Sequence, residues 1–348
     1  MKTLKDFDFE GKRVLVRCDF NVPIKNGIIQ DDFRIIQSIP TIRYLIDARA
    51  RVVILAHFGR PKGTVQEEFT LRPIAQHLQT LLQTRVEFIA DTIGKEADQA
   101  IRAMKPGDVA FLENVRFYPG EERNDPDFAN QLARLGDIYI NDAFGACHRT
   151  HASIVGIPKH LPCAAGLLVE QEITALKKVS INPKKPLVVV VGGAKVENKA
   201  SFLKTISEQA DAILLGDLLT IEARKKGIEV SQNTELVYAL DGVDGTFDLG
   251  SETIERFKEK IMNAKTVFWA GPLGRVEEEK YEKGSLVIAN AIVSSGAYAV
   301  AGGGDLAAFL GKHNLREKFA HVSTGGGAML AFLAGETLPG LQALEFQV

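Results

Sequence analysis

The sequence has few cysteines, no excess of charge of either sign and no long apolar run, and each absence excludes a class of protein. Its three cysteines, Cys18, Cys147 and Cys163, are scattered, unlike the dense cysteines of a secreted disulfide framework. The 42 basic and 44 acidic residues leave a formal charge of -2, which gives no global reason to expect nucleic acid or a membrane surface as a partner. No segment has the length of a membrane span, and no signal peptide pattern begins the chain. We therefore expect a cytoplasmic protein whose anion sites, if any, are local.

What the sequence does have is a regular alternation of short β-branched runs with longer segments of helical spacing. At 348 residues the chain exceeds what one hydrophobic core usually serves, so two domains are expected. The alternation predicts βαβ units and parallel sheets covered on both faces. The predicted strands are 13–17, 51–56, 85–90, 108–113 and 137–142 in the first half, and 186–193, 212–217, 266–271, 298–304 and 320–327 in the second.

A helical segment at 165–179 is followed by the breaker cluster "NPKKP" at 182–186, and we place the domain junction there. The predicted organisation is an N-terminal domain over 1–165, a hinge helix over 166–182 and a C-terminal domain over 183–335. A tail over 336–348 remains, for which packing back on the N-terminal domain is one arrangement.

In the first half, polar and basic residues follow the predicted strands. "VLVRCDFNVP" sets Arg17, Asp19 and Asn21 two residues apart, so a strand would place all three on one side. Further basic residues lie at or beyond the carboxyl ends of strands, which a parallel sheet gathers at one edge: Arg34, His57, Arg60, Arg116, His148, Arg149 and His151. Because the guanidinium fork binds phosphate and carboxylate oxygens in pairs, this set favours a small, multiply anionic ligand. Separate surface ion pairs are the alternative, and the spacing of "CHRTH" and Cys163 matches no usual zinc site.

In the second half, four predicted strands end in glycines. "VVVVGGAKVENK" joins a strand and two glycines to a predicted helix carrying Lys195 and Lys199, which suits phosphate oxygens. The Walker spacing is absent, and "GGGDLA" matches the dinucleotide fingerprint only weakly. Asp305, directly after three glycines, is placed to hold a magnesium ion between phosphates. Tight connections without a ligand remain the alternative for any single turn.

Together these segments resemble the phosphoglycerate kinase family. The resemblance rests on "VLVRCDFNVP", "DDFRI", "AHFGRPKG", "LENVRFYPGEE", "NDAFG", "HRTHAS", "GGAKVENK", "AGPLG", "GGGD" and "HVSTGGGA", which occur in family order over almost the whole chain. It implies an α/β fold of two doubly wound, Rossmann-like parallel-sheet domains joined by a hinge helix. It also implies reversible phosphoryl transfer between 1,3-bisphosphoglycerate and ADP, giving 3-phosphoglycerate and ATP.

Carried onto matching positions, the resemblance implies a role for each of the following residues. Phosphoglycerate would be bound by Arg17, Asp19, Asn21, Arg34, His57, Arg60, Arg116 and Arg149. The nucleotide would be bound by Gly193, Lys195, Lys199, Gly250, Gly271, Glu277, Gly302, Gly303, Gly304, Gly325 and Gly326, with Glu277 at the ribose and Asp305 at Mg²⁺. Arg34 and Lys195 are the candidates for neutralising the transferred group. Mg²⁺ with ATP or ADP is the expected cofactor, the partners are small molecules rather than nucleic acid or membrane, and a monomer is expected.

The chain departs from the family pattern on the nucleotide side. Ala270 replaces an asparagine, Leu306 a hydroxyl residue, Arg275 an apolar residue and Asp217 a glycine, and Ser251 stands in place of a proline. The chain also lacks tens of residues near 228–244 that in relatives supply a strand and part of the adenine pocket. A lost hydrogen-bonding group costs about 1 to 3 kcal/mol if its partner stays unpaired. Two hypotheses follow: an active kinase, or a 3-phosphoglycerate sensor with weakened nucleotide use.

Overall fold

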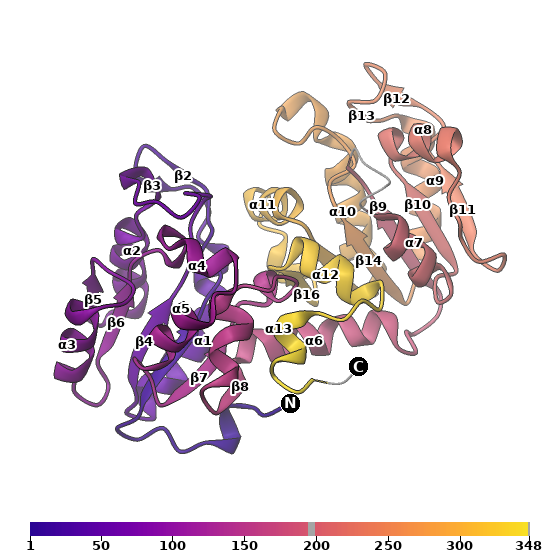
Figure 1. Cartoon of the computed structure of the whole chain (residues 1–348). Helices are drawn as coiled ribbons and strands as arrows, with labels where there is room; N and C mark the ends of the chain where they lie inside the picture. The colour runs from indigo at the N-terminus through magenta and orange to yellow at the C-terminus, as the bar shows by residue number, and fades with distance from the viewer. Residues whose placement is uncertain (194–198, 347–348) are drawn as a thin grey trace. The chain divides into compact units, whose positions relative to one another are not determined.

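The computed structural model describes residues 1–193 and 199–346, and these divide into two compact units (Figure 1). Unit 1 comprises Met1–Gln171 and Thr337–Val348, and unit 2 comprises Glu172–Glu336. The division falls inside the long helix α6 (Leu167–Ser180), in the segment where the sequence predicts a helix. In the part of the chain that the structure describes, no helix has the length and apolar character needed to cross a membrane.

Unit 1 is built on a six-stranded parallel sheet with the order β5-β6-β4-β1-β7-β8. Its strands are β1 (Arg13–Arg17), β4 (Arg51–Leu55), β5 (Val86–Ile89), β6 (Val109–Leu112), β7 (Ile138–Asn141) and β8 (Cys163–Ala165). The first five are confirmed predictions. β8 was not predicted, because a three-residue edge strand with two alanines has neither the length nor the β-branching on which the prediction relied.

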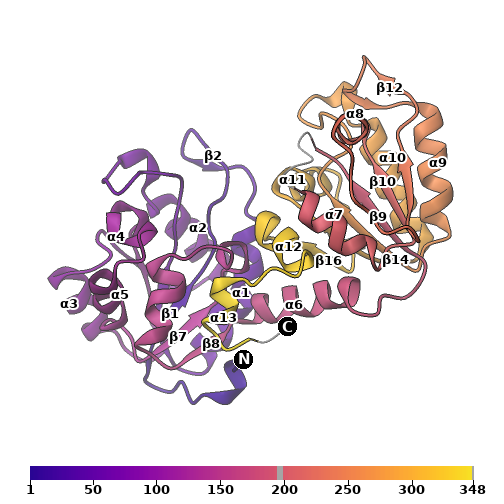
Figure 2. The same cartoon turned by 45° about the vertical axis from the view of Figure 1, so that its right-hand side comes forward.

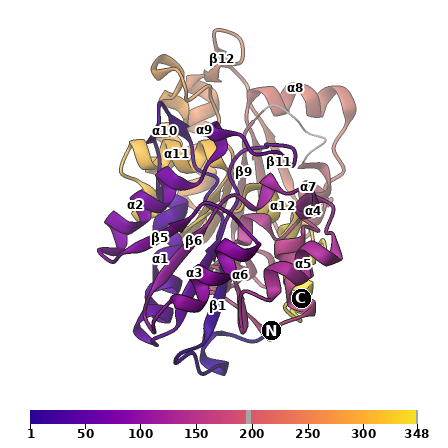
Figure 3. The same ribbon diagram turned by 60° about the vertical axis from the view of Figure 1, so that its left-hand side comes forward.

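Helices cover both faces of this sheet, as the right-handed crossover rule requires for this strand order (Figure 3). One face holds α1 (Phe33–Asp47) and α2 (Arg72–Leu82). The other holds α3 (Lys95–Ala103), α4 (Pro119–Glu122) and α5 (Pro126–Ala133). Unit 1 also contains a short hairpin of β2 (Ile24–Lys25) and β3 (Ile28–Ile29) and the C-terminal helix α13 (Pro339–Gln342).

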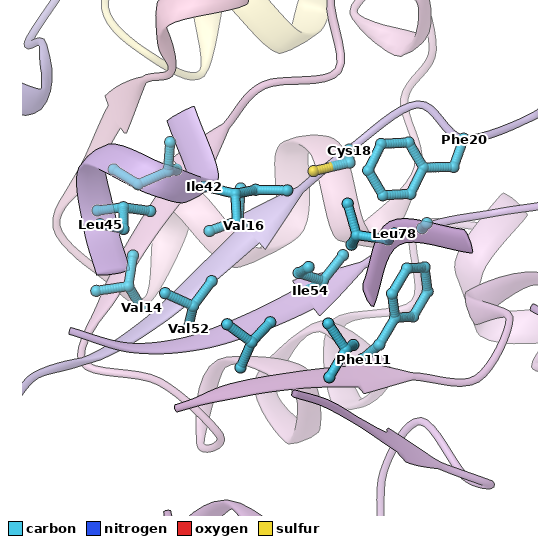
Figure 4. Close-up of a cluster of buried hydrophobic side chains, with 14 of the residues drawn as sticks. Val14, Val16, Cys18, Phe20, Ile42, Leu45, Val52, Ile54, Leu78 and Phe111 are labelled. Atoms are coloured by element: carbon cyan, nitrogen blue, oxygen red, sulfur yellow. The ribbon is translucent and has the colours of Figure 1, made fainter. Parts of the chain in front are cut away.

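The period of two along a strand decides which face each side chain of β1 occupies. Val14 and Val16 pack with Val52 and Ile54 of β4 and with side chains of α1 and α2 in the core (Figure 4). Arg13, Leu15 and Arg17 therefore lie on the opposite face, toward α3, α4 and α5. Burying the apolar set fixes the register of the strand and thereby also fixes where its two arginines point.

Unit 2 repeats the plan with the order β11-β10-β9-β14-β15-β16, again all parallel. Its strands are β9 (Leu187–Val191), β10 (Ala212–Leu215), β11 (Glu235–Tyr238), β14 (Thr266–Ala270), β15 (Tyr298–Gly302) and β16 (His321–Ser323). All except the edge strand β11 were predicted. Two such parallel sheets confirm the predicted fold class.

The helices of unit 2 are α7 (Ala200–Ser207), α8 (Asp217–Lys226), α9 (Ser251–Met262), α10 (Lys283–Ser295), α11 (Gly304–Lys312) and α12 (Gly326–Leu333). α9 and α10 pack beside one another on one face of the sheet, and α7 and α12 pack beside one another on the other (Figure 2). A short hairpin joins β12 (Gly242–Val243) to β13 (Asp248–Leu249). A helix is predicted after Gly193, and residues 194–198, including Lys195, lie outside the described residues; the described helix α7 begins at Ala200, with Lys199 as its N-cap.

Each unit holds its own part of α6 through buried carboxylates. In unit 1, Asp142 Oδ1 accepts hydrogen bonds from the backbone N–H of Leu168 at 3.0 Å and from the hydroxyl of Thr41 at 2.8 Å. In unit 2, Glu172 accepts from the Thr324 N–H at 2.7 Å and lies 2.8 Å from His321 Nε2. The helix is therefore held by polar contacts in its first turn, at Leu168, and before its middle, at Glu172.

Candidate functional site

The basic residues of unit 1 meet around Arg17, the last residue of β1. Its guanidinium is 1% exposed. Nε donates to Ser153 Oγ at 2.7 Å, Nη1 donates to the carbonyl of Cys18, and Nη2 lies 3.0 Å from His57 Nδ1. All three nitrogens therefore have protein partners, and a direct contact with a ligand would require one of them to be released.

His57 follows β4 and is 4% exposed. Arginine can only donate, so Nδ1 of His57 accepts from Arg17 and the ring proton lies on Nε2. Burial lowers the pKa of His57 well below its usual range, and the positive charges of Arg17, Arg116, Arg149 and Arg34 lower it further. His57 is thus a neutral imidazole with a fixed tautomer. These four arginines are therefore close enough to the His57 ring for their charges to affect its protonation.

Arg34, near the start of α1, faces the loop that follows β1. Its Nη1 donates to Asp19 Oδ2 at 3.0 Å and lies 3.4 Å from the carbonyl of Asn21. Asn21 Oδ1 in turn accepts from the backbone N–H of Gly59 at 3.0 Å. Because β1 ends at Arg17, Asp19 and Asn21 lie in a loop rather than on one strand face, which corrects the sequence-based expectation. The loop still brings Asp19 to Arg34.

Arg116 is a buried cation with unused hydrogen-bonding capacity. It is 3% exposed, and Nη1 donates to the Gly59 carbonyl at 2.7 Å. Nε lies 3.3 Å from Glu122 Oε1, but neither Nε nor Nη2 has a hydrogen-bond partner. Burial and the charge of Arg149 lower the pKa of Arg116 to about 10. A buried guanidinium with open N–H groups is costly to the fold, and an anion would satisfy it.

The segment after β7 contributes Arg149, His148 and His151. Burial and the charges of Arg116, Arg17 and Arg149 lower the pKa of His151 to about 3. Burial and Arg149 also lower the pKa of His148. Arg149 is therefore close to both histidines and to Arg116. Because their pKa values are lowered, His148 and His151 carry no positive charge beside Arg149 near neutral pH. Arg60, directly after the β4 loop, is exposed.

Two residues that the sequence analysis did not single out hold this cluster together. Glu121 in α4 is fully buried and accepts from Ser153 Oγ at 2.6 Å and Ser153 N–H at 2.9 Å. It also lies 3.7 Å from His151 Nδ1. Burial raises the pKa of Glu121, against the opposing charge of Arg17. Its presence five residues after Arg116 in "RFYPGEE" was the available signal.

We call Arg17, Arg34, His57, Arg116 and Arg149 the basic cluster. It combines four guanidinium groups with a neutral imidazole donor. Of the acids beside it, Asp19 and Glu121 already have hydrogen-bond partners, and Glu122 forms an ion pair with Arg116. This arrangement can bind a small anion with several oxygens. It offers only weak bases, since burial and the neighbouring arginines lower the pKa values of His57, His148 and His151.

Unit 2 contains a cavity of about 390 Å³ at the carboxyl ends of its strands, where parallel sheets bind ligands. Phe247, Pro272 and Leu273 supply apolar wall. Of the predicted nucleotide residues, Gly193, Glu277 and Asp305 line this cavity. Lys199 Nζ would lie 3.3 Å from a Cβ on Gly193, so the lysine is beside the same turn.

The structure gives different reasons for glycine at the predicted nucleotide-binding positions. Gly193 and Gly303 have positive φ, of 92° and 114°, and Gly303 lies against Gly271 where two strands end together. A Cβ on Gly250 would meet the carboxylate of Asp241, and one on Gly302 would meet the Met329 side chain. Packing thus accounts for Gly250 and Gly302. Gly304 and Gly326 have open space around the Cα and could approach a phosphate. Gly325 is the N-cap residue of α12.

Asp217 lines the cavity and is 7% exposed. Its Oδ2 has no hydrogen-bond partner. Burial raises the pKa of Asp217 to about 7, and the neighbouring carboxylates of Asp241 and Asp248 contribute to the rise. A carboxyl group in this position is a cost that folding alone does not explain.

Among the other departures from the family pattern, Arg275 lines the cavity but is held by contacts within the protein. Arg275 stacks on Phe247, with Cζ 3.8 Å from the ring centroid, and its Nη1 lies 3.2 Å from Glu278 Oε1. Leu306 is fully buried and Ala270 is 2% exposed, and neither lines the cavity. We expected a lost hydroxyl and amide at the phosphates. In this chain those two positions are instead occupied by core side chains.

Asp305 is the predicted ligand of a magnesium ion in this cavity. Asp305 is exposed in the first turn of α11 and lines the cavity. Among the residues that the structure describes, no group of three or more His, Cys, Asp or Glu side chains is arranged to hold a metal. Mg²⁺ commonly takes one or two protein carboxylates and completes its shell with phosphate oxygens and water. Asp305 fits that mode of Mg²⁺ binding.

The model of one protein family, described as phosphoglycerate kinase, matches residues 4–238 and 220–336. The chain belongs to the phosphoglycerate kinase family. It is 40% identical to the phosphoglycerate kinase of Fervidobacterium nodosum over 390 aligned positions, which cover 98% of both chains. It is 41% identical to that of Borrelia hermsii over 389 positions, covering 99% of both.

Two solved structures show the same fold. A phosphoglycerate kinase from Pyrococcus horikoshii matches with a TM-score of 0.90 at 33% identity, covering 99% of this chain and 98% of that chain. One from Coxiella burnetii matches with a TM-score of 0.83 at 33% identity and the same coverage. The alignments to the curated relatives span more positions than this chain has residues. The relatives therefore carry residues without a counterpart here, in line with the expected deletion.

Proposed function

We propose that the chain catalyses reversible phosphoryl transfer between 1,3-bisphosphoglycerate and ADP, giving 3-phosphoglycerate and ATP. The observation that carries this proposal is Arg116, a buried guanidinium with two nitrogens that lack hydrogen-bond partners, in a cluster of four arginines. A three-carbon acid bearing a phosphate supplies the oxygens that this cluster lacks. We assign phosphoglycerate binding to Asp19, Asn21, Arg34, His57, Arg60, Arg116 and Arg149. Arg17 would orient His57 through the hydrogen bond to its Nδ1.

We assign the nucleotide to the cavity of unit 2. Glu277 would meet the ribose, Gly193 and Lys199 the phosphates, and Asp305 the Mg²⁺ that accompanies ATP or ADP. Bound Mg²⁺ supplies charge that offsets the phosphate oxygens. Lys195 keeps its predicted role in neutralising the transferred group. Gly271, Gly303, Gly304, Gly325 and Gly326 are assigned to the turns around the phosphates.

The chemistry requires little beyond position and charge. In the ATP-consuming direction the attacking group is a carboxylate, which is already an anion, so no general base is needed. This agrees with a cluster whose histidines are neutral and surrounded by arginines. Arg34 would neutralise developing charge on the transferred group. The two ligands must also meet with water excluded, and we infer closure of the two units about α6 for this step.

A second candidate is a 3-phosphoglycerate sensor with weak nucleotide use, and Asp217 in the cavity wall is the observation that favours it. Full-length relatives at about 40% identity that are named phosphoglycerate kinase favour the kinase. We also expect the chain to act as a cytoplasmic monomer on small molecules only.

The two candidates are separated by one assay. Purified protein is mixed with Mg²⁺, ATP and 3-phosphoglycerate, and acyl phosphate is trapped with hydroxylamine. The kinase predicts hydroxamate formation that depends on all three components. Tight 3-phosphoglycerate binding without turnover above background would instead establish the sensor.

A further inference from the structure

A second basic cavity lies in unit 1, at the opposite end of β1 from the basic cluster. It has a volume of about 720 Å³. Its floor is formed by the first residues of β1 and β4, and its walls by α3 and the end of α5: Arg13, Arg51, Gly94, Lys95, Asp98, Arg102, Gln131, Arg134 and Leu135. Five of these nine residues are basic and one is acidic. None of them belongs to the site described above.

The two floor arginines are neighbours in register. Arg13 of β1 pairs with Arg51 of β4 in the parallel ladder, so both side chains project from the same face of the sheet. Like charges side by side on adjacent strands destabilise a sheet. The two floor arginines therefore repel each other in the absence of sufficient negative charge beside them.

The counter-charge under the cavity is limited. Arg13 Nη2 lies 2.6 Å from Asp137 Oδ1, while Arg51 Nε and Nη2 donate only to the Gly11 carbonyl, at 3.1 and 2.7 Å. Burial would raise the pKa of Asp137, but hydrogen bonds from Arg13 and the charges of Arg13 and Arg51 outweigh it and lower the pKa. One carboxylate therefore faces two guanidinium groups.

The walls add more positive charge than negative. Lys95, Asp98 and Arg102 follow a spacing of three and four along α3, which places them on one side of that helix. Arg102 Nε donates to Asp98 Oδ2 at 2.7 Å, so these two charges offset each other. Lys95 and Arg134 have no ion-pair partner among residues 1–193 and 199–346. Including Asp137, five basic groups face two acidic ones.

We propose that this cavity binds a small polyphosphate anion, separately from the phosphoglycerate site. Arginine forks at the floor suit phosphate oxygens in pairs, and mobile lysine and arginine ends at the rim suit a ligand that carries several charges. A chain with net charge of -2 attracts no anion in general, so the excess here is local. The cavity is large enough for a chain of phosphates and is bounded by helices on two sides.

The test is calorimetric titration of inorganic tripolyphosphate into the full-length protein saturated with 3-phosphoglycerate and with metal-free ATP, so that both proposed substrate sites are occupied. We expect one remaining binding event, weakened at least tenfold in Lys95→Gln/Arg134→Gln. The matched control is Lys105→Gln/Lys159→Gln, which removes the same charge from exposed positions of unit 1 outside the cavity. That control should bind as the wild type does.

A second arm makes the result independent of 3-phosphoglycerate binding. Arg60→Gln/Arg149→Gln removes two cations from the first site, and with metal-free ATP again saturating the nucleotide site, tripolyphosphate should still bind this variant with wild-type affinity at one site. If tripolyphosphate binding is weakened equally in Lys95→Gln/Arg134→Gln and in the control Lys105→Gln/Lys159→Gln, the effect is one of general electrostatics and the proposal is overturned. The absence of any binding event in saturated wild-type protein would also overturn it. Retained thermal unfolding temperatures identify variants that fold.

Discussion

Arg17 Nη2 lies 3.0 Å from His57 Nδ1, and this contact fixes the ring proton of His57 on Nε2. The arginine is the last residue of β1 and the histidine follows β4, its neighbour in the sheet. Parallel pairing of two strands thus decides the tautomer of a residue in the site. Histidine acts here as a neutral hydrogen-bond donor rather than as a cation.

Replacing His57 should distinguish a neutral donor from a charged one. Glutamine offers both an acceptor to Arg17 and a donor to the ligand, so His57→Gln should keep 3-phosphoglycerate affinity within a few-fold. His57→Ala leaves a buried N–H of Arg17 unpaired, at about 1 to 3 kcal/mol, and should weaken binding about tenfold or more. Calorimetry at pH 6, 7 and 8 measures both. Because the pKa of His57 is well below its usual range, the ratio of wild-type to His57→Gln affinity should stay constant. A ratio that rises toward pH 6 would contradict a neutral ring.

Replacing Arg34 should affect turnover more than substrate binding. Its guanidinium contacts Asp19 and the Asn21 carbonyl and is about one-quarter exposed, so it has room to meet the transferred group. Removing one donor to developing charge costs about 10² to 10³ in kcat. Arg34→Ala should show a loss of this size in the hydroxamate assay, with Arg34→Lys intermediate. A pure rise in KM with unchanged kcat would reduce Arg34 to a binding residue.

Asp217 should make the stability of the protein depend on pH. Its pKa is raised to about 7, so the folded state holds a proton that the unfolded state releases above about pH 4. Stability is therefore lost as the pH rises from about 4 to about 7. Asp217→Asn removes this loss, and its unfolding free energy should exceed that of wild type at pH 8, by at most about 4 kcal/mol, and match it near pH 4. Denaturant unfolding at the two pH values measures the difference. A constant difference at both would contradict the raised pKa.

Leu306 should behave as a core residue rather than as a lost phosphate contact. It is fully buried in α11, so Leu306→Thr would bury a hydroxyl and leave a small void, at about 1 to 3 kcal/mol. We expect a lower unfolding temperature and an unchanged affinity for MgADP. The exposed neighbour Ala308→Ser is the matched control for the hydroxyl. Tighter MgADP binding by Leu306→Thr would show that the leucine does impair the nucleotide site.

Much of the fold follows from local sequence. The β-branched run "LVVVV" at 187–191 favours a fully buried strand, and the structure places it as β9 in the interior of the unit 2 sheet. The short edge strands β8 and β11 carry weaker patterns, because their pairing is decided by the neighbouring strand rather than by their own residues. The loop after β1 was misjudged as strand for the same reason: alternation continues past Arg17, but the pairing does not.

The cationic residues of the site could be predicted from the sequence, but the residues that hold them in place could not. Arginines past strand ends are visible in the sequence because the fold gathers those ends. The contact of Glu121 with Ser153, and the approach of Asp241 and Asp248 to Asp217, depend on packing between distant segments. Leu306 shows the converse, since a departure at a motif position indicated a missing contact but the side chain faces the core.

The most direct test of the account is calorimetric titration of 3-phosphoglycerate into wild type, Arg116→Lys and Lys105→Gln/Lys159→Gln. Arg116→Lys keeps the charge and removes the unpaired fork, so the account predicts saturable binding in wild type and in the exposed double variant, and binding at least about tenfold weaker in Arg116→Lys. Wild-type affinity in a folded Arg116→Lys protein, or no binding to wild type at all, would contradict it.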